Sequence, residues 1–220
     1  MKTIHVRGLS NGIPVGTIYC LGRNYAEHAK EMHNEIPTAP IIFLKPSNAI
    51  IHDCEDIIRP SISKLLHHEV ELVVALGKSG KNISEEKAHE YILGYGVGLD
   101  MTLRDLQRED MKKGLPWNVA KGFDTSAPVS EIIPSSNIKN PGSLEIRCSV
   151  NGALRQHTSA DKMIFSVPNV ITYLSSIFTL ERGDLIFTGT PEGVEEVKEE
   201  DTIEAELVGW TKIHHQVKVG

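Results

Sequence analysis

Most apolar segments of this chain are short, rich in β-branched residues and separated by stretches of unequal length. They predict strands at 15–21, 41–44, 68–76, 95–100, 202–208 and 212–219, and the residues around Asn151-Gly152 alternate as in a hairpin. Helices are expected at 26–33, at 84–91, at 103–113 with Thr102 as N-cap, and at 168–178, with a core-facing side made of Val170, Ile171, Leu174, Ile177 and Phe178. Strands outnumber helices, and their order is too irregular for a regular parallel α/β fold. The sequence therefore predicts an α+β fold dominated by mixed sheets.

The length and charge of the chain limit what it can be. With 220 residues and 40% hydrophobic content it can bury one sizeable core, so a single domain spanning 1–220 is expected. A formal net charge of -6, without a run of lysines or arginines, gives no attraction to nucleic acid or to an anionic membrane surface. No segment approaches the ~18 apolar residues of a membrane span, and the N-terminus lacks the apolar core of a signal peptide. We therefore expect a cytoplasmic protein with neither nucleic acid nor membrane as a partner.

Two glutamates stand on alternate residues of the predicted strand 68–76. Side chains two apart in a strand point to the same face, so Glu69 and Glu71 would lie side by side. Asp100 stands at the predicted end of another strand, after glycines that let a ligand approach the backbone. Carboxylates that converge either become protonated or bind a cation, and oxygen ligands favour Mg²⁺, Mn²⁺ or Ca²⁺. A solvent-facing strand edge carries such glutamates more commonly than a metal site does, so both readings stay open.

Other polar residues stand where a small substrate could be handled. His28 and Glu31 are three apart in a predicted helix, a spacing at which a carboxylate can orient an imidazole as a general base. Lys121 lies in a segment with few other charges and could stabilise an oxyanion, and Thr190 could present its hydroxyl to a substrate carboxylate. The same patterns occur in solvated helices, surface lysines and plain turns. The residues by themselves leave these roles open as well.

Seven segments, in order along the chain, resemble the fumarylacetoacetate hydrolase family, and most of all its single-domain acylpyruvase and oxaloacetate decarboxylase branch. The segments are GRNYAEHAKE, FLKP, HHEVEL, GLDMTLRDLQ, GLPWNVAKGFDTSAPV, VNG and GDLIFTGTPEGV. The resemblance begins near Thr17, so residues 1–16 are expected to be a short N-terminal extension of one catalytic domain. It implies mixed β-sheets rolled into a β-rich fold with a few short helices, and a homodimer.

The resemblance also implies a role for ten residues, each by its place in these segments. The metal ligands implied are Glu69, Glu71 and Asp100. The catalytic residues implied are His28, Glu31 and Lys121. The substrate-binding residues implied are Arg23, Arg104, Gln107 and Thr190. The cofactor implied is Mg²⁺, with Mn²⁺ able to substitute.

The activity implied is metal-dependent cleavage of a C–C bond in a 2-oxo acid, by acylpyruvate hydrolysis, oxaloacetate decarboxylation or both. Either reaction would pass through an enolate stabilised by the metal ion. In the hydrolysis, His28 polarised by Glu31 would activate a water, and Lys121 would stabilise the resulting oxyanion. Three alternatives remain. Two lie within the same family: an isomerase and decarboxylase acting on 2-hydroxyhepta-2,4-diene-1,7-dioate and, more distantly, an enzyme that cleaves ureidoglycolate. The third is a non-catalytic protein that binds a 2-oxo acid or a cation.

Overall fold

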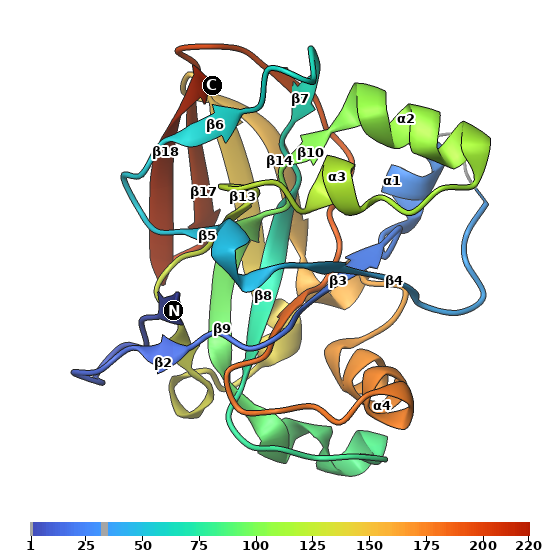
Figure 1. The fold of residues 1–220 in the computed structure, drawn as a ribbon. Coiled ribbons are helices and arrows are strands. Elements are labelled where there is room, and N and C mark those ends of the chain that lie inside the picture. The colour runs from blue at the N-terminus through green and yellow to red at the C-terminus, as the bar shows by residue number, and fades with distance from the viewer. Residues whose placement is uncertain (1, 32–34) are drawn as a thin grey trace.

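Two large β-sheets form the centre of the protein, whose computed structural model describes residues 2–31 and 35–220. A mixed sheet of six strands contains, in spatial order, β12 (Ile133–Pro134), β9 (Ile92–Leu99), β8 (Val70–Leu76), β15 (Leu185–Phe187), β3 (Ile18–Gly22) and β4 (Ile41–Lys45). A sheet of five strands contains β14 (Ala153–Ser159), β13 (Glu145–Val150), β17 (Thr202–Leu207), β18 (Thr211–Val219) and β6 (Ile57–Arg59). Strands β17 and β18 pack across β9, so the two sheets enclose a common core (Figure 1).

Shorter strands and helices complete the fold. The short strands are β1 (Thr3–Ile4) with β2 (Ile13–Pro14), β5 (Ile50–Ile51) with β11 (Ala127–Pro128), and the trio β10 (Thr102–Leu103), β7 (Leu66–His67) and β16 (Glu196–Val197). The α-helices are α1 (Ala26–Glu31), α2 (Arg104–Lys113), α3 (Asn118–Lys121) and α4 (Val167–Ile177). The 3-10 helices are η1 (Ser47–Ala49), η2 (Glu85–Tyr91), η3 (Ser135–Asn137), η4 (Pro141–Ser143) and η5 (Ala160–Lys162). The expected α+β fold of mixed sheets with a few short helices is confirmed.

The central strands β8 and β15 of the six-stranded sheet are buried on both faces. On one face Leu72 and Val97 pack with Ile203 of the five-stranded sheet. On the other face Val73 and Phe187 belong to a second core. Because neither face meets water, β8 is buried at every position. In β13 and β17 buried residues alternate with more exposed ones, as expected for a sheet with one solvated face.

The N-terminal residues are part of the second core. β1 pairs with β2, and Ile4 and Ile13 in these strands are buried together with Val6 and Val15. The segment that was expected to be an extension therefore covers one face of the six-stranded sheet.

One predicted helix cap is wrong. Thr102 does not cap α2, because it lies in β10 paired with His67, and its hydroxyl donates to the carbonyl of Asp100 at 3.0 Å. Leu103 occupies the N-cap position without a side-chain hydrogen bond. Gly114 ends α2 with a φ of 66°, as its place after the lysines predicted.

The other helices follow the prediction with small differences. Residues 85–91 form a 3-10 helix, and the predicted helix 26–33 is described only to Glu31, with its last two residues outside the described part of the chain. In α4 Val170, Ile171 and Leu174 are buried as expected. Ile177 is 51% exposed, because it is the last residue of α4, beyond the turns that contact the core. Among the described helices, none is long and apolar enough to cross a membrane.

The antiparallel pairing of β8 with β9 places the first residues of β8 beside the last residues of β9, at one end of the sheet. β8 begins where β9 ends, and the N–H of Asp100 donates to the carbonyl of Glu69 at 2.8 Å. In Figure 1 α1, α2 and α3 gather at this end, whereas α4 lies at the opposite end. Residues from strands and helices that are distant in sequence therefore meet there.

Candidate active site

Three buried carboxylates converge where β8 begins and β9 ends. Glu69 immediately precedes β8, Glu71 is the second residue of β8, and Asp100 follows β9. One oxygen of each carboxylate lies within 4.8 Å of the others, and none of the three residues is more than 5% exposed. The predicted metal ligands are thus brought together inside the protein. The alternative of a solvent-facing strand edge is wrong.

Two predicted residues place positive charge against these carboxylates. Nζ of Lys121, in α3, donates to Oε2 of Glu69 at 2.7 Å and to Oδ2 of Asp100 at 2.6 Å. Arg104, the first residue of α2, donates to Glu69 through Nη2 and to Oε1 of Gln107 at 2.5 Å through Nη1. Both cationic side chains are at most 4% exposed, so little water screens these pairs.

A third buried cation, Lys45, was missed by the sequence analysis. It ends β4, and its Nζ lies 2.8 Å from Oδ1 of Asp100 and donates to the carbonyls of Met101 and Lys121. It directly follows the predicted strand 41–44, within the segment FLKP. A lysine at the end of an apolar strand was the available signal, but only the tertiary structure shows which carboxylate it meets.

The contacts divide the carboxylates into two kinds. Burial raises the pKa of Glu69, but the charges of Lys121 and Arg104 outweigh burial and hold this pKa below its usual range. Burial, with the negative charges of Asp100 and Glu69, raises the pKa of Glu71 well above its usual range. The N–H of Gly189, which donates to Oε2 of Glu71 at 2.8 Å, does not offset this. Glu71 is therefore the carboxylate whose ionised form lacks compensation.

The donor set fits a divalent cation. Oδ1 of Asp100 is buried and has no hydrogen-bond partner within the described residues, since the ammonium of Lys45 contacts it outside hydrogen-bond geometry. A cation bound between the three carboxylates would satisfy this oxygen and compensate Glu71. Carboxylate oxygens without a nitrogen or sulfur ligand suit Mg²⁺ or Mn²⁺ better than zinc.

A cavity of about 440 Å³ opens in front of the carboxylates. Of the ten predicted site residues, nine line this cavity: Arg23, His28, Glu31, Glu69, Glu71, Arg104, Gln107, Lys121 and Thr190. Asp100 is not among the lining residues, but its carboxylate accepts a hydrogen bond from Lys121, which is. The structure thus gathers all ten around one site, while the individual catalytic and binding roles stay predictions.

Helix α1 carries the predicted base to this cavity. Nδ1 of His28 lies 3.4 Å from Oε2 of Glu31, a long contact for a hydrogen bond. The two carboxylate oxygens of Glu31 also accept from the N–H of Gly193, at 3.0 and 3.2 Å. Glu31 therefore links His28 to the loop that follows Thr190.

The loop after β15 depends on a glycine. Gly189 has a φ of +96°, and a Cβ on it would lie 2.7 Å from the Cβ of Asn24. The buried amide of Asn24 donates to the carbonyl of Thr188 at 2.8 Å, which holds the start of α1 against this loop. The loop that presents Thr190 is thus fixed to α1 on one side and to the metal ligand Glu71 on the other. Asn24 and Gly189 lie within the quoted segments, but no pattern around them predicted a role.

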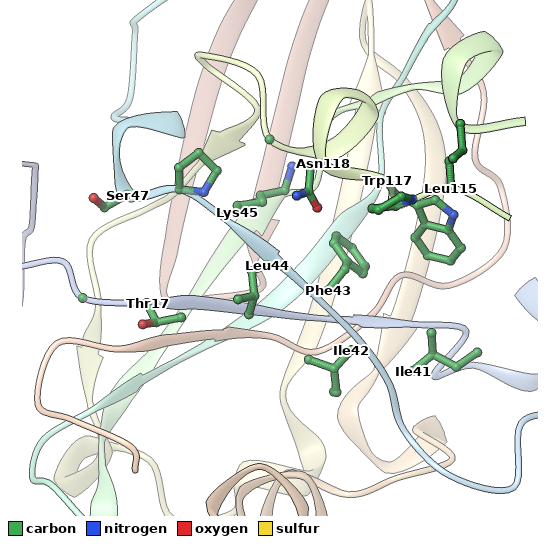
Figure 2. Close-up of a pocket in the computed structure, with 14 residues that line it drawn as sticks. Thr17, Ile41, Ile42, Phe43, Leu44, Lys45, Ser47, Leu115, Trp117 and Asn118 are labelled. Carbon is green, nitrogen blue, oxygen red and sulfur yellow. The ribbon is translucent and has the colours of Figure 1, made fainter. Parts of the chain in front are cut away.

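A second hollow, of about 890 Å³, lies beside this cavity, and Trp117 lines both. Figure 2 shows Leu44 on the opposite side of β4 from Phe43 and Lys45. The rings of Phe43 and Trp117 have centroids 5.8 Å apart, and Nζ of Lys121 lies 5.0 Å from the centre of the Phe43 ring. Phe43 therefore packs against both Trp117 and the ammonium of Lys121.

Converging buried carboxylates, one of them without compensation, beside a cavity of polar groups are typical of an enzyme that uses a metal ion, and this chain is such an enzyme. Residues 17–218 match the family described as fumarylacetoacetate (FAA) hydrolase C-terminal, and the chain belongs to this family. The family expected from the sequence is confirmed.

Individual relatives are similar over most of their length. The chain is 49% identical over 201 residues to the oxaloacetate tautomerase FAHD1, mitochondrial, of Mus musculus, covering 91% of each chain. It matches the crystal structure of fumarylpyruvate hydrolase from Pseudomonas aeruginosa in complex with Mn²⁺ and pyruvate with a TM-score of 0.96 and 38% identity, over 100% of this chain and 96% of that one. For 2-hydroxyhepta-2,4-diene-1,7-dioate isomerase from Mycobacterium marinum the TM-score is 0.83 and the identity 35%, over 93% and 75% of the two chains.

Proposed function

We propose that this enzyme cleaves a C–C bond in oxaloacetate, in an acylpyruvate or in both, with Mg²⁺ or Mn²⁺ bound by Glu69, Glu71 and Asp100. The observation that carries the proposal is the convergence of three buried carboxylates, among which ionised Glu71 lacks compensation, at the cavity that holds the predicted base. The similar fumarylpyruvate hydrolase, solved with Mn²⁺ and pyruvate, supports it. When bound, the metal ion would supply a Lewis acid that stabilises negative charge on the carboxylate and 2-oxo oxygens of such a substrate.

Polar groups around the cavity suit the binding of a 2-oxo acid. Oε1 of Gln107 accepts from Arg104, so the amide N–H groups of Gln107 remain as donors. Arg23 has a φ of 59°, a left-handed backbone that costs a residue other than glycine about 1 kcal/mol and is found at binding sites. We assign Arg23 to the distal carboxylate of oxaloacetate and Thr190 to the carboxylate next to the 2-oxo group.

The proton transfers are assigned to side chains of this cavity. In the hydrolysis of an acylpyruvate, His28 would take a proton from the water that attacks the distal carbonyl carbon. The C–C bond then breaks, and the same proton passes to the departing carbon, so that an acid and pyruvate are released. Burial lowers the pKa of Lys121, but Asp100 and Glu69 outweigh burial, so its ammonium stays protonated and can donate to the oxyanion.

Decarboxylation of oxaloacetate makes a smaller demand on these residues. Loss of carbon dioxide leaves an enolate of pyruvate, and no water has to be activated. His28 would only pass a proton from solvent to C3 of the product. The same cavity therefore suits both reactions.

Tautomerisation of oxaloacetate is a second candidate. It moves one proton between C3 and the 2-oxo oxygen and breaks no C–C bond, so the same base would serve. The relative that is 49% identical is an oxaloacetate tautomerase, which favours this candidate. The isomerase and decarboxylase alternative rests on a less similar structure, at 35% identity. A non-catalytic protein would have no need for a buried lysine and a histidine beside a metal site.

The test is a substrate panel with and without a chelator. Oxaloacetate, acetylpyruvate and 2-hydroxyhepta-2,4-diene-1,7-dioate are incubated with the purified protein and Mg²⁺, with pyruvate formation reporting cleavage and the ultraviolet absorbance of the enol reporting tautomerisation. We expect pyruvate from oxaloacetate or acetylpyruvate, lost with chelator and restored by Mg²⁺ or Mn²⁺. Turnover of the dienedioate alone would establish the isomerase alternative. Binding of oxalate without any turnover would establish the non-catalytic one.

The homodimer and the cytoplasmic location are also part of the proposal. The resemblance of the quoted segments supports the first, and the composition of the chain supports the second. One chain has a mass of 24.3 kDa. Light scattering after size exclusion is expected to give twice this mass. The mass of a single chain at micromolar concentration would contradict the dimer.

A further inference from the structure

Gln156 lies in the middle of β14, is 1% exposed and lies outside the residues that line the active-site cavity. Its side-chain amide nevertheless forms four hydrogen bonds. Oε1 accepts from the N–H of Val70 and from Nδ1 of His68, both at 3.0 Å. Nε2 donates to Oγ1 of Thr190 and to the carbonyl of Pro191, both at 2.9 Å. The amide thus joins β14 and the start of β8 to the loop that presents Thr190.

The chemistry of the partners fixes which way this amide points. A backbone N–H can only donate, so the atom facing Val70 must be the oxygen. A proline carbonyl can only accept, so the atom facing Pro191 must be the nitrogen. The two assignments agree, and the contact with Thr190 is therefore an N–H group donating to a hydroxyl oxygen.

This direction has a consequence for the proton of Thr190. Because Oγ1 accepts from Gln156, the hydroxyl proton is left for another acceptor. Among the residues that the structure describes, no oxygen accepts a hydrogen bond from this hydroxyl, and Thr190 lines the cavity beside the metal ligands.

Two nearby buried threonines behave differently. The hydroxyl of Thr188, in the same loop, donates to the carbonyl of Leu72 at 2.8 Å. The hydroxyl of Thr102 donates to the carbonyl of Asp100 at 3.0 Å. Each of these threonines uses its proton on the backbone, so neither can donate to a ligand. The contact with Gln156 distinguishes Thr190 from both.

We propose that Gln156 is a positioning residue that makes Thr190 a hydrogen-bond donor to the carboxylate of the substrate. The inference rests on the proposed function, because it takes a 2-oxo acid as the ligand. Gln156 touches neither substrate nor metal ion. It orients the hydroxyl of Thr190 before the substrate arrives, so that binding does not have to reorient it.

The test is a double-mutant cycle read out by ligand binding. Wild type, Gln156→Met, Thr190→Val and the double variant are compared, first for Mn²⁺ affinity alone and then for oxalate affinity at saturating Mn²⁺. We expect Gln156→Met to weaken oxalate binding about tenfold with Mn²⁺ affinity unchanged, since a hydrogen bond to a charged ligand is lost or weakened. Thr190→Val should weaken oxalate binding at least as much, and the double variant no further.

The controls separate this role from general damage to the core. Cys148 is buried, and its Sγ lies 3.8 Å from Nδ1 of His68, the partner of Oε1 of Gln156. Cys148→Ala should leave oxalate affinity unchanged. If Gln156→Met does not fold, the same cycle is run with Gln156→Glu. The carboxyl group of that variant still accepts from the N–H of Val70. It carries at most one proton, so it cannot donate to both Thr190 and Pro191.

Several results would overturn the inference. Losses that multiply in the double variant would mean that Gln156 does not act through Thr190. A parallel loss of Mn²⁺ affinity would mean that it only supports the metal ligands. If wild type with Mn²⁺ binds no oxalate at all, the proposed function fails, and this inference fails with it.

Discussion

Nζ of Lys121 lies 2.6 Å from Oδ2 of Asp100, and both side chains are almost completely buried. The same ammonium donates to Glu69 at 2.7 Å. Lys121 thus compensates two predicted metal ligands while the metal ion is absent, and competes with the ion for their oxygens when it binds. The lysine predicted to act in catalysis is therefore also expected to limit the affinity of the site for metal.

Replacing Lys121 with methionine should tighten Mn²⁺ binding and lower turnover together. Without the ammonium, the oxygens of Glu69 and Asp100 are free and the repulsion between two cations is gone, so we expect Mn²⁺ affinity to rise about tenfold. Turnover of the preferred 2-oxo acid should fall on the order of 100-fold, because the oxyanion loses its donor. Calorimetric titration measures the first effect and the pyruvate assay the second. Lys162→Met, at a lysine that is 69% exposed, is the control, and a weaker Mn²⁺ affinity in Lys121→Met would contradict the competition.

Stabilisation of the fold by Mg²⁺ should grow as the pH rises. Burial and the charges of Asp100 and Glu69 raise the pKa of Glu71, so in the metal-free protein its contribution to stability is complete below the ordinary carboxyl pKa. That contribution is lost as the pH rises through the raised pKa, when ionised Glu71 faces two other carboxylates. A bound cation removes this repulsion. The increase in Tm caused by Mg²⁺ should therefore be several degrees larger at about pH 8 than at about pH 5.5.

The matched variant for this pH effect is Glu71→Gln. Its amide resembles the protonated acid and cannot ionise, so the metal-free protein should keep its stability at high pH. Mg²⁺ should then raise Tm little, at any pH. A wild-type increase in Tm that is the same at both pH values would show that Glu71 does not control metal binding.

Alanine at Gly189 should be far more damaging than alanine at Gly114. Both glycines have positive φ, +96° and +66°, so each substitution incurs a backbone cost of about 1 kcal/mol or more. A Cβ at Gly114 meets nothing within 4 Å, whereas one at Gly189 would lie 2.7 Å from the Cβ of Asn24. We expect unfolding free energies lower by about 1 kcal/mol for Gly114→Ala and by about 3 kcal/mol for Gly189→Ala. Urea denaturation measures both.

The same pair separates stability from metal binding. The N–H of Gly189 donates to Glu71, so displacing this loop should also weaken Mn²⁺ binding in Gly189→Ala. Gly114 lies at the end of α2, and its variant should bind Mn²⁺ like wild type. Equal losses of stability in the two variants would rule out the clash with Asn24.

Replacing His28 with alanine should affect the two cleavage reactions unequally. Hydrolysis of an acylpyruvate needs an activated water, and a general base contributes on the order of 100-fold or more to such a step. Decarboxylation of oxaloacetate needs no water, so its rate should fall much less. Pyruvate formation from acetylpyruvate and from oxaloacetate measures the two rates. His157→Ala, at a histidine whose side chain is 50% exposed, is the control, and equal losses in His28→Ala would argue against a water-activating base.

The sequence by itself determined what lies within one element. The period of two in the predicted strand 68–76 put Glu69 beside Glu71, and the two carboxylates do converge, although β8 itself begins at Val70. Asn151-Gly152 predicted the turn between β13 and β14, with positive φ at both residues. The ordered segments gave the family, and so the α+β fold. These features depend on local geometry or on motifs that can be read along the chain.

Tertiary structure alone decided which elements meet. The antiparallel pairing of β8 with β9 brings Asp100 to Glu69, and β4 brings Lys45 to Oδ1 of Asp100. Thr102 looked like a helix cap but is held in β10, because strand pairing fixes its backbone and turns its hydroxyl to Asp100. Gln156 reaches Thr190 only because two sheets pack face to face. Periodicity fixes the side of an element on which a residue lies, but the residue opposite is set by sheet order and packing, which depend on contacts between distant parts of the chain.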